Sequence, residues 1–114
     1  MIKVKYAYDK DKRECSLLVK GHAGQAEIGK DIVCASASIL AYTIAQVIKL
    51  MDDNGDLAEP PTLELNGGDA NIVCRAKDDD LYANLVEDFY VIRTGYVLLA
   101  HNYPQYVEII DGEA

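Results

Sequence analysis

The sequence contains few of the residues from which proteins build metal centres and disulfide scaffolds. It has three cysteines and two histidines. The cysteine count is odd, and no pair of cysteines has the CxxC spacing of a zinc site. No secretory signal peptide is present at the start of the sequence. We therefore expect a cytoplasmic protein that uses neither a metal ion nor another cofactor.

Basic residues are also scarce. Eleven lysines and arginines stand against nineteen aspartates and glutamates, which gives a net charge of −8. An acidic surface repels nucleic acid and attracts basic partners. The glycine-containing stretch over residues 21–29 has neither the Lys-Ser/Thr end of a P-loop nor the GxGxxG spacing. These absences favour a protein as the binding partner and argue against nucleic acid.

One apolar segment, residues 32–51, is long enough to suggest a membrane span. Polar side chains interrupt this segment, namely Ser36, Ser38, Thr43, Gln46 and Lys49. We therefore expect a buried core helix and no membrane contact. The chain has 114 residues and an ordinary globular composition, which predicts a single domain over residues 1–114.

Local patterns predict five strands and two helices. The strands are predicted over residues 2–8, 15–19, 62–66, 71–76 and 105–110, and the helices over residues 32–51 and 81–99. Polar turns, including an Asn-Gly-Gly-Asp turn, join the first four strands into two hairpins. The order ββαββαβ indicates an α+β fold with one antiparallel sheet and two helices packed on one face.

The two predicted helices differ in the distribution of their apolar residues. The second helix has one continuous apolar face, formed by Leu81, Leu85, Phe89, Ile92, Tyr96 and Leu99. The first helix has a stripe formed by Val33, Ala37, Leu40, Ile44, Val47 and Met51. Additional apolar residues, Ile32, Ile39 and Tyr42, lie outside this stripe. We expect a second subunit to cover them, which predicts a homodimer.

Residues 21–38 combine the features of a reactive site. Asp31 is a suitable N-cap, which places the helix start at Ile32 and Cys34 in the first turn. Unpaired N–H groups and the positive end of the helix dipole favour an anion there, which for cysteine is the nucleophilic thiolate. His22 is the candidate partner that takes the proton and returns it.

Packing is the alternative explanation of Cys34, because free cysteine is often buried. The connection before the helix favours chemistry. This connection spans residues 21–30, longer than the usual ~4–6 residues. Its glycines Gly21, Gly24 and Gly29 permit close approach to a ligand. We interpret the connection as a substrate loop, in which the part from Gly24 to Gly29 is a lid that orders over bound substrate.

The blocks Gly21-His22-Ala23 and Asp31-Ile32-Val33-Cys34-Ala35, with Gly29 between them and Ser38 after them, resemble a known signature. It is the signature of the ribosomal-processing cysteine protease family, Prp. The resemblance implies a cytoplasmic, usually homodimeric cysteine endopeptidase. Its substrate would be a large-subunit ribosomal protein, from which it removes a short N-terminal extension after an aromatic pair. A phage-encoded relative that processes capsid or scaffold proteins is an alternative.

The resemblance assigns the nucleophile to Cys34 and the general base and acid to His22. Two further residues have open roles. Asp31 either only caps the helix or also orients His22. Ser38, one turn after Cys34, forms a hydrogen bond either near the sulfur or back to the Cys34 carbonyl. We expect the N–H groups of Cys34 and Ala35 to stabilise the oxyanion.

Two other functions are compatible with the residues alone. In a non-enzymatic, ribosome-associated binding module, Cys34 would be buried packing. In a thiol redox protein, a resolving cysteine should lie near Cys34. Cys15 and Cys74 are expected to pack inside strands instead.

Overall fold

The computed structural model describes residues 1–21, 28–66 and 69–111, with the backbone alone for residues 28–31 and 111. The elements are β1 (Ile2–Asp9), β2 (Glu14–Lys20), α1 (Ile28–Asp53), β3 (Thr62–Asn66), β4 (Asp69–Arg75), α2 (Asp79–Asn102) and β5 (Val107–Asp111). This order is the predicted ββαββαβ, and the α+β fold class is confirmed.

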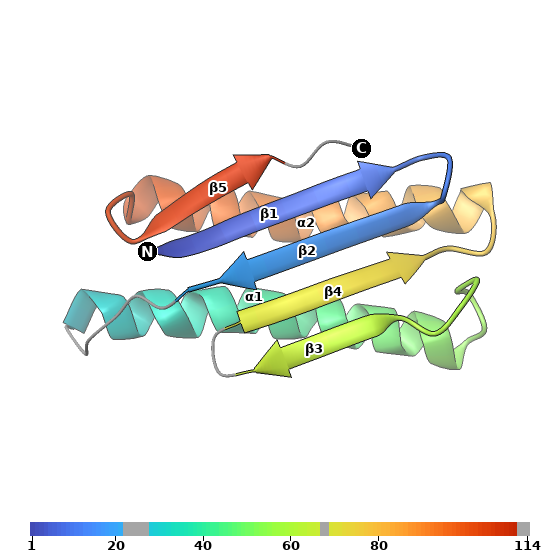
Figure 1. Cartoon of the computed structure of the whole chain (residues 1–114), viewed down its shortest axis with the longest axis horizontal. Coiled ribbons are helices and arrows are strands. Elements are labelled where there is room, and N and C mark those ends of the chain that lie inside the picture. Colours follow the sequence, from blue (N-terminus) through green and yellow to red (C-terminus); the bar gives the residue numbers. More distant parts are fainter. Residues whose placement is uncertain (22–27, 67–68, 112–114) are drawn as a thin grey trace.

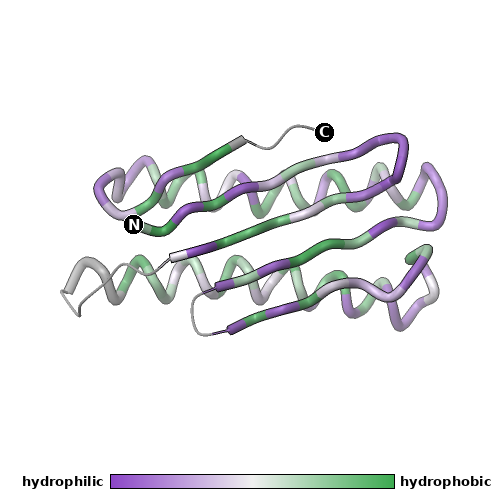
Figure 2. The backbone as a smooth tube through the Cα atoms, in the orientation of Figure 1, coloured by the Kyte–Doolittle hydropathy of each residue, from purple (hydrophilic) through white to green (hydrophobic). Residues whose placement is uncertain are grey.

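The five strands form one sheet in the order β3-β4-β2-β1-β5. Both helices lie behind the sheet and run in opposite directions, while the front face of the sheet carries no helix (Figure 1). Buried side chains from alternate positions of the central strands point to the helices, among them Val4, Leu17 and Ile72. Green apolar segments along these strands and along α1 mark the two sides of this core (Figure 2).

The sheet is mixed, although the sequence predicted an antiparallel one. β5 pairs in parallel with β1, with Ile2 opposite Val107. The connection through α2 explains the direction, because a strand that follows a helical crossover runs parallel to the strand before the helix. β4 and β1 are both antiparallel to β2. β5 therefore arrives at the edge of β1 in the same direction as β1, and it begins at Val107, after the turn that contains Pro104.

α1 packs on the sheet through a stripe of smaller side chains than predicted. The residues buried on this helix are Val33, Ala37, Ala41, Ile44, Ala45 and Ile48. The predicted stripe members Leu40, Val47 and Met51 are only partly buried. Ile32, Ile39 and Tyr42 are about half exposed in the single chain, at 51%, 61% and 49%. Small residues face the sheet because they let a long helix lie close to it.

α2 has the buried face that its sequence predicted. Leu85, Phe89, Ile92, Tyr96 and Leu99 are buried, and the Tyr96 hydroxyl donates a 2.8 Å hydrogen bond to the Ala37 carbonyl of α1. Gly95 lies against Leu40, since a Cβ at Gly95 would be 2.7 Å from a Leu40 methyl group. The glycine therefore marks the close approach of the two helices.

Part of α1, Ile32–Asp53, is long and apolar enough to cross a membrane by length and composition. One helix of this kind is weak evidence, because core helices of soluble proteins have the same composition. About a third of its apolar window is buried in the fold. The buried part is the stripe that packs on the sheet.

Candidate active site

The chain leaves β2 at Gly21 under tight geometric constraint. Gly21 has a φ of +95°, a conformation that side-chain-bearing residues rarely adopt. A Cβ on Gly21 would lie 2.4 Å from the carbonyl oxygen of Met1. The Gly21 N–H donates a 3.1 Å hydrogen bond to Oδ1 of Asp69. Only glycine fits here, so the first glycine of the motif has a definite structural role.

The helix that carries Cys34 begins earlier than the sequence predicted. α1 starts at Ile28, so Asp31 is the fourth helical residue and is not the N-cap. The N-cap preference of Asp31 does not determine the helix start, because the helix begins three residues earlier and includes Gly29. Gly29 and Lys30 therefore belong to the helix, and the connecting segment after Gly21 is shorter than the ten residues predicted.

This earlier start changes the expected chemistry at Cys34. Cys34 is the seventh residue of the helix, in its second turn rather than its first. The N–H groups of Cys34 and Ala35 are then used in i→i−4 hydrogen bonds of the helix and are not free for an oxyanion. The effect of the helix dipole is also concentrated in the first turn. Stabilisation of a Cys34 thiolate therefore has to come from another group.

Two of the predicted site residues, His22 and Gly24, lie outside the described residues. Their roles remain predictions from the sequence. Asp31 is described only in its backbone, so whether it orients His22 also remains a prediction.

The three cysteines fall into two environments. Cys34 is half-buried at the edge of the core, whereas Cys15 and Cys74 are fully buried. Cys15 and Cys74 face each other across β2 and β4, and the Cys74 thiol lies 3.8 Å from the Cys15 carbonyl oxygen. Burial raises the pKa of the Cys74 thiol to about 12 and also raises that of Cys15. Both are packing residues, as predicted, and Cys34 is the cysteine that reagents can reach.

Ser38 lies one turn after Cys34 and is half-buried. Among the described residues its hydroxyl has no hydrogen-bond partner, so it does not bond back to the Cys34 carbonyl. Ser36 behaves differently, because its hydroxyl donates to the Ile32 carbonyl at 2.8 Å. The back-bonded alternative for Ser38 is therefore wrong. Ser38 instead lines a small hollow between α1 and the sheet, whose other members include Tyr42 and Asp69.

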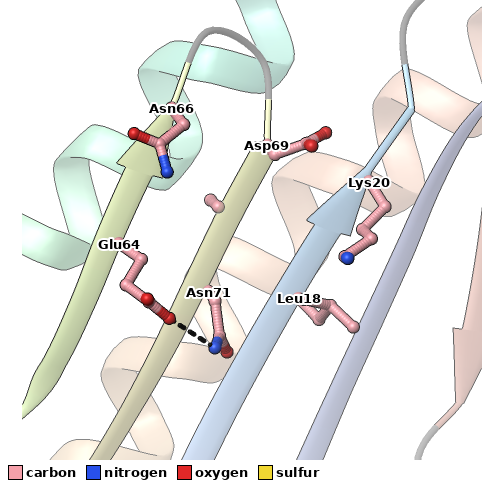
Figure 3. Close-up of a pocket in the computed structure, with 7 residues that line it drawn as sticks. Leu18, Lys20, Glu64, Asn66, Asp69 and Asn71 are labelled. Atoms are coloured by element: carbon pink, nitrogen blue, oxygen red, sulfur yellow. Dashed lines mark hydrogen bonds between the residues drawn. The ribbon is translucent and has the colours of Figure 1, made fainter.

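A larger hollow of about 430 Å³ lies on the open face of the sheet, beside the end of β2. Its walls are formed by Leu18, Lys20, Glu64, Asn66, Asp69, Ala70 and Asn71. Figure 3 shows polar side chains from β3, β4 and β2 around it, with Asn71 donating a 2.9 Å hydrogen bond to Glu64. Asp69 borders both hollows. The residues near the end of β2 thus form a recessed, polar surface on the face of the sheet that carries no helix.

Within residues 1–21, 28–66 and 69–111, no group of three histidine, cysteine or acidic side chains could hold a metal ion. The acidic run 78–80 instead forms the N-cap and the first turn of α2. Asp78 is the N-cap and accepts a 2.9 Å hydrogen bond from the Leu81 N–H. Asp78 therefore caps α2.

A family model for the cysteine protease Prp matches residues 1–108. This chain belongs to the Prp family. It is therefore a cysteine protease, and the non-enzymatic binding module is excluded as its main function. The match therefore extends well beyond residues 21–38, over nearly the whole chain.

Solved structures with a similar fold align with nearly the whole chain. SMU.848 from Streptococcus mutans has a TM-score of 0.70 and 22% identity, over 100% of this chain and 96% of that one. The essential ribosomal processing protease Prp from S. aureus, in complex with a substrate peptide, has a TM-score of 0.69 and 18% identity, over 98% of this chain and 100% of that one. Its complex with a covalently linked product peptide has a TM-score of 0.69 and 21% identity over the same shares. No curated protein matches this chain.

The sequence did not indicate that Asp69 contacts Gly21, and Asp69 was predicted only as part of a turn. The residue is 48 positions from Gly21 in the sequence. The two meet because β4 pairs with β2, with Val19 opposite Ala70. No local pattern reports that pairing. The only available signal was an acidic residue at the exit of the Asn-Gly-Gly turn.

Proposed function

We propose that this chain is a cysteine endopeptidase in which Cys34 is the nucleophile and His22 is the general base and acid. Family membership over residues 1–108, which include both motif blocks, carries this proposal. The burial of the cysteines supports the choice of nucleophile. Of the three, only Cys34 is not buried, and the hollow lined by Ser38 begins one helical turn away from it.

The reaction proceeds in two stages. His22 takes the proton of Cys34, and the thiolate attacks the scissile carbonyl carbon. The C–N bond breaks, the leaving amine receives the proton from His22, and a thioester to Cys34 remains. His22 then accepts a proton from water, whose oxygen attacks the thioester and releases the acid product and the thiol. Because Cys34 lies beyond the first helical turn, His22 has to supply most of the stabilisation of the thiolate.

The substrate we propose is the N-terminal extension of a large-subunit ribosomal protein, cut after an aromatic pair in the cytoplasm. The S. aureus structure of similar fold is a ribosomal processing protease with a bound substrate peptide. The charge of this chain is compatible with such a substrate. Its net charge of −8 would steer a basic ribosomal protein toward it and speed their encounter.

We also propose that the enzyme is a homodimer built through the outer side of its helical layer. The two helices carry eight exposed large apolar residues, Ile32, Ile39, Tyr42, Leu50, Tyr90, Val91, Val97 and Leu98. Large exposed apolar surface on a soluble domain favours an interaction site. Ile39→Lys should shift the protein to monomer in sedimentation analysis. Ile110→Lys is the control, because Ile110 lies on β5 and is also exposed. An unchanged dimer in Ile39→Lys would contradict this arrangement.

Mass spectrometry of a cleavage reaction tests the enzymatic proposal. The substrate is a ribosomal-protein N-terminal peptide with a Phe-Phe pair, and the enzymes are wild type, Cys34→Ala and His22→Ala. We expect cleavage after the pair by wild type alone. Cys74→Ala serves as the matched control, since it removes a thiol that is buried away from the site.

The outcomes separate the chemistry from the substrate. If wild type leaves the peptide intact but Cys34 reacts rapidly with iodoacetamide at neutral pH, the substrate assignment is wrong and a phage structural protein becomes the next substrate to test. If Cys34 reacts as slowly as the two buried cysteines, its assignment as nucleophile is wrong.

A further inference from the structure

Asp69 is the first residue of β4. Its side chain points from β4 toward the end of β2 (Figure 3). There its Oδ1 accepts the Gly21 N–H at 3.1 Å. The side chain is half-buried, so this hydrogen bond is partly shielded from competing water. Two segments that are far apart in the sequence are thus joined at the point where β2 ends.

Gly21 is held from a second direction as well. The Met1 carbonyl oxygen occupies the space where a Cβ would be, and the backbone of Gly21 is in a left-handed conformation. The N–H and the Cα of Gly21 are therefore both fixed by other parts of the chain. The next residue is His22, whose Cα is bonded through one peptide unit and lies ~3.8 Å from that of Gly21.

Asp69 also borders the hollow that contains Ser38 and Tyr42 of α1. Ser38 is one helical turn from Cys34. A single residue therefore touches the exit of the histidine segment and the wall next to the cysteine helix. A contact from the sheet that fixes Gly21 fixes the start of the segment that leads from His22 to the helix of Cys34.

We propose that Asp69 is a positioning residue of the active site, which fixes Gly21 through its carboxylate oxygen and thereby holds His22 at the right distance from Cys34. This inference rests on the roles proposed above for His22 and Cys34. The hydrogen bond acts through its acceptor oxygen rather than through charge. A general base displaced by about 1 Å can lose roughly 10²-fold in rate.

Three variants test the proposal. Asp69→Ala removes the acceptor, whereas Asp69→Asn keeps an oxygen that can accept the Gly21 N–H. Asp9→Ala is the matched control, because Asp9 is also half-buried and accepts a backbone N–H, that of Lys12 at 3.2 Å, in the turn between β1 and β2. The first measurement is the rate at which iodoacetamide alkylates Cys34 at pH 6.5, followed by mass spectrometry. The second is kcat and KM on the peptide.

We expect Asp69→Ala to lower both kcat and the alkylation rate by about 10-fold or more, with a smaller change in KM. Asp69→Asn should stay within about three-fold of wild type, and Asp9→Ala should match wild type. Rescue by asparagine separates positioning by a hydrogen bond from a general loss of stability. An Asp69→Ala enzyme as active as wild type, or an Asp69→Asn enzyme as weak as Asp69→Ala, would overturn the proposal.

The alkylation assay also separates this proposal from the one on which it rests. If His22→Ala slows alkylation of Cys34 but Asp69→Ala does not, the dyad stands and the role of Asp69 is wrong. If His22→Ala alkylates Cys34 at the wild-type rate, the dyad itself is wrong and the role of Asp69 is overturned with it.

Discussion

At one end of the sheet, where β1 turns into β2 and α2 begins, ion pairs connect the elements. At the other end, where β2 stops at Gly21, the described residues are connected by hydrogen bonds to Asp69 and Glu64 and form no ion pair with one another. We call these the turn end (residues 9–14, 57–59 and 75–79) and the loop end (residues 18–21, 34–42, 64–66 and 69–71). The three ion pairs found among the described residues all lie at the turn end, Arg13 with Asp79 at 2.7 Å and Arg75 with Glu14 and Glu59 at 3.0 and 3.3 Å. Both hollows lie at the loop end.

The difference separates stability from function. The turn end joins the hairpin, the α1–β3 connection and the start of α2 with ion pairs and an N-cap. The loop end leaves the Ser38 hydroxyl without a partner among the described residues, and the smaller hollow that Ser38 lines lies one helical turn after Cys34. Active sites often give up stabilising contacts so that substrate can make them. Substitutions at the two ends should therefore affect different properties.

The largest effect is expected from the glycine at the loop end. Gly21→Ala forces a side chain into a φ of +95° and against the Met1 carbonyl. It should lower the free energy of unfolding by roughly 3 kcal/mol and strongly reduce cleavage. Gly55→Ala is the control, since Gly55 has a φ of +76° but no atom within 4 Å of a Cβ. It should cost about 1 kcal/mol and spare activity. Chemical denaturation measures the free energy of unfolding of both variants. Equal losses of this free energy would show that Gly21 is constrained only by its φ.

Two cysteine variants should separate effects on stability from effects on cleavage activity. Cys74→Ala leaves a small cavity in the core and should lower the free energy of unfolding by about 1.5 kcal/mol with cleavage retained. Cys34→Ala should abolish cleavage while lowering stability by less, because Cys34 is only half-buried. Urea denaturation and peptide cleavage give the two values. A Cys34→Ala protein less stable than Cys74→Ala would contradict the assignment of Cys34 to function.

The cap of α2 tests the turn end directly. Asp78→Ala removes the acceptor of the Leu81 N–H and should lower the free energy of unfolding by about 1 kcal/mol. Asp78→Asn should recover most of this loss, since asparagine is also a good N-cap. Cleavage by both variants should equal that of wild type at a temperature where each is folded. Reduced cleavage without unfolding would mean that the two ends are coupled.

The smallest effect is expected from Tyr8, whose buried hydroxyl has no hydrogen-bond partner among the described residues. Burial raises its pKa to about 12. The folded pKa lies above the unfolded value of about 10, so the contribution of Tyr8 to stability is full below pH ~10 and is lost as the pH rises toward 12. Tyr8→Phe should flatten the loss of stability between pH 9 and 11 and slightly raise stability at pH 8. The exposed Tyr90→Phe is the control, and an equal pH slope in wild type and Tyr8→Phe would refute this account.

The sequence predicted what short-range patterns determine. The hairpins and the buried face of α2 follow from alternation and from the spacing of apolar residues, and these predictions are confirmed. The predicted start of α1 was wrong. Asp31 is a good N-cap in isolation, but in the folded chain a turn of helix forms before it. The direction of β5 and the contact of Asp69 with Gly21 depend on strand pairing between distant segments. No local pattern contains that information, while the motif around Cys34 was visible because it is contiguous.

The contact between Met1 and Gly21 affects how this enzyme should be produced. β1 begins at Ile2, directly next to the residue that starts the histidine segment. A purification tag fused ahead of Met1 would emerge beside Gly21, where the proposed active site begins, and would compete with substrate for that space. β5 ends opposite Tyr6, well along the sheet from Gly21. A tag after the last residue is therefore the better choice for kinetic work, and an uncleaved N-terminal tag should be avoided.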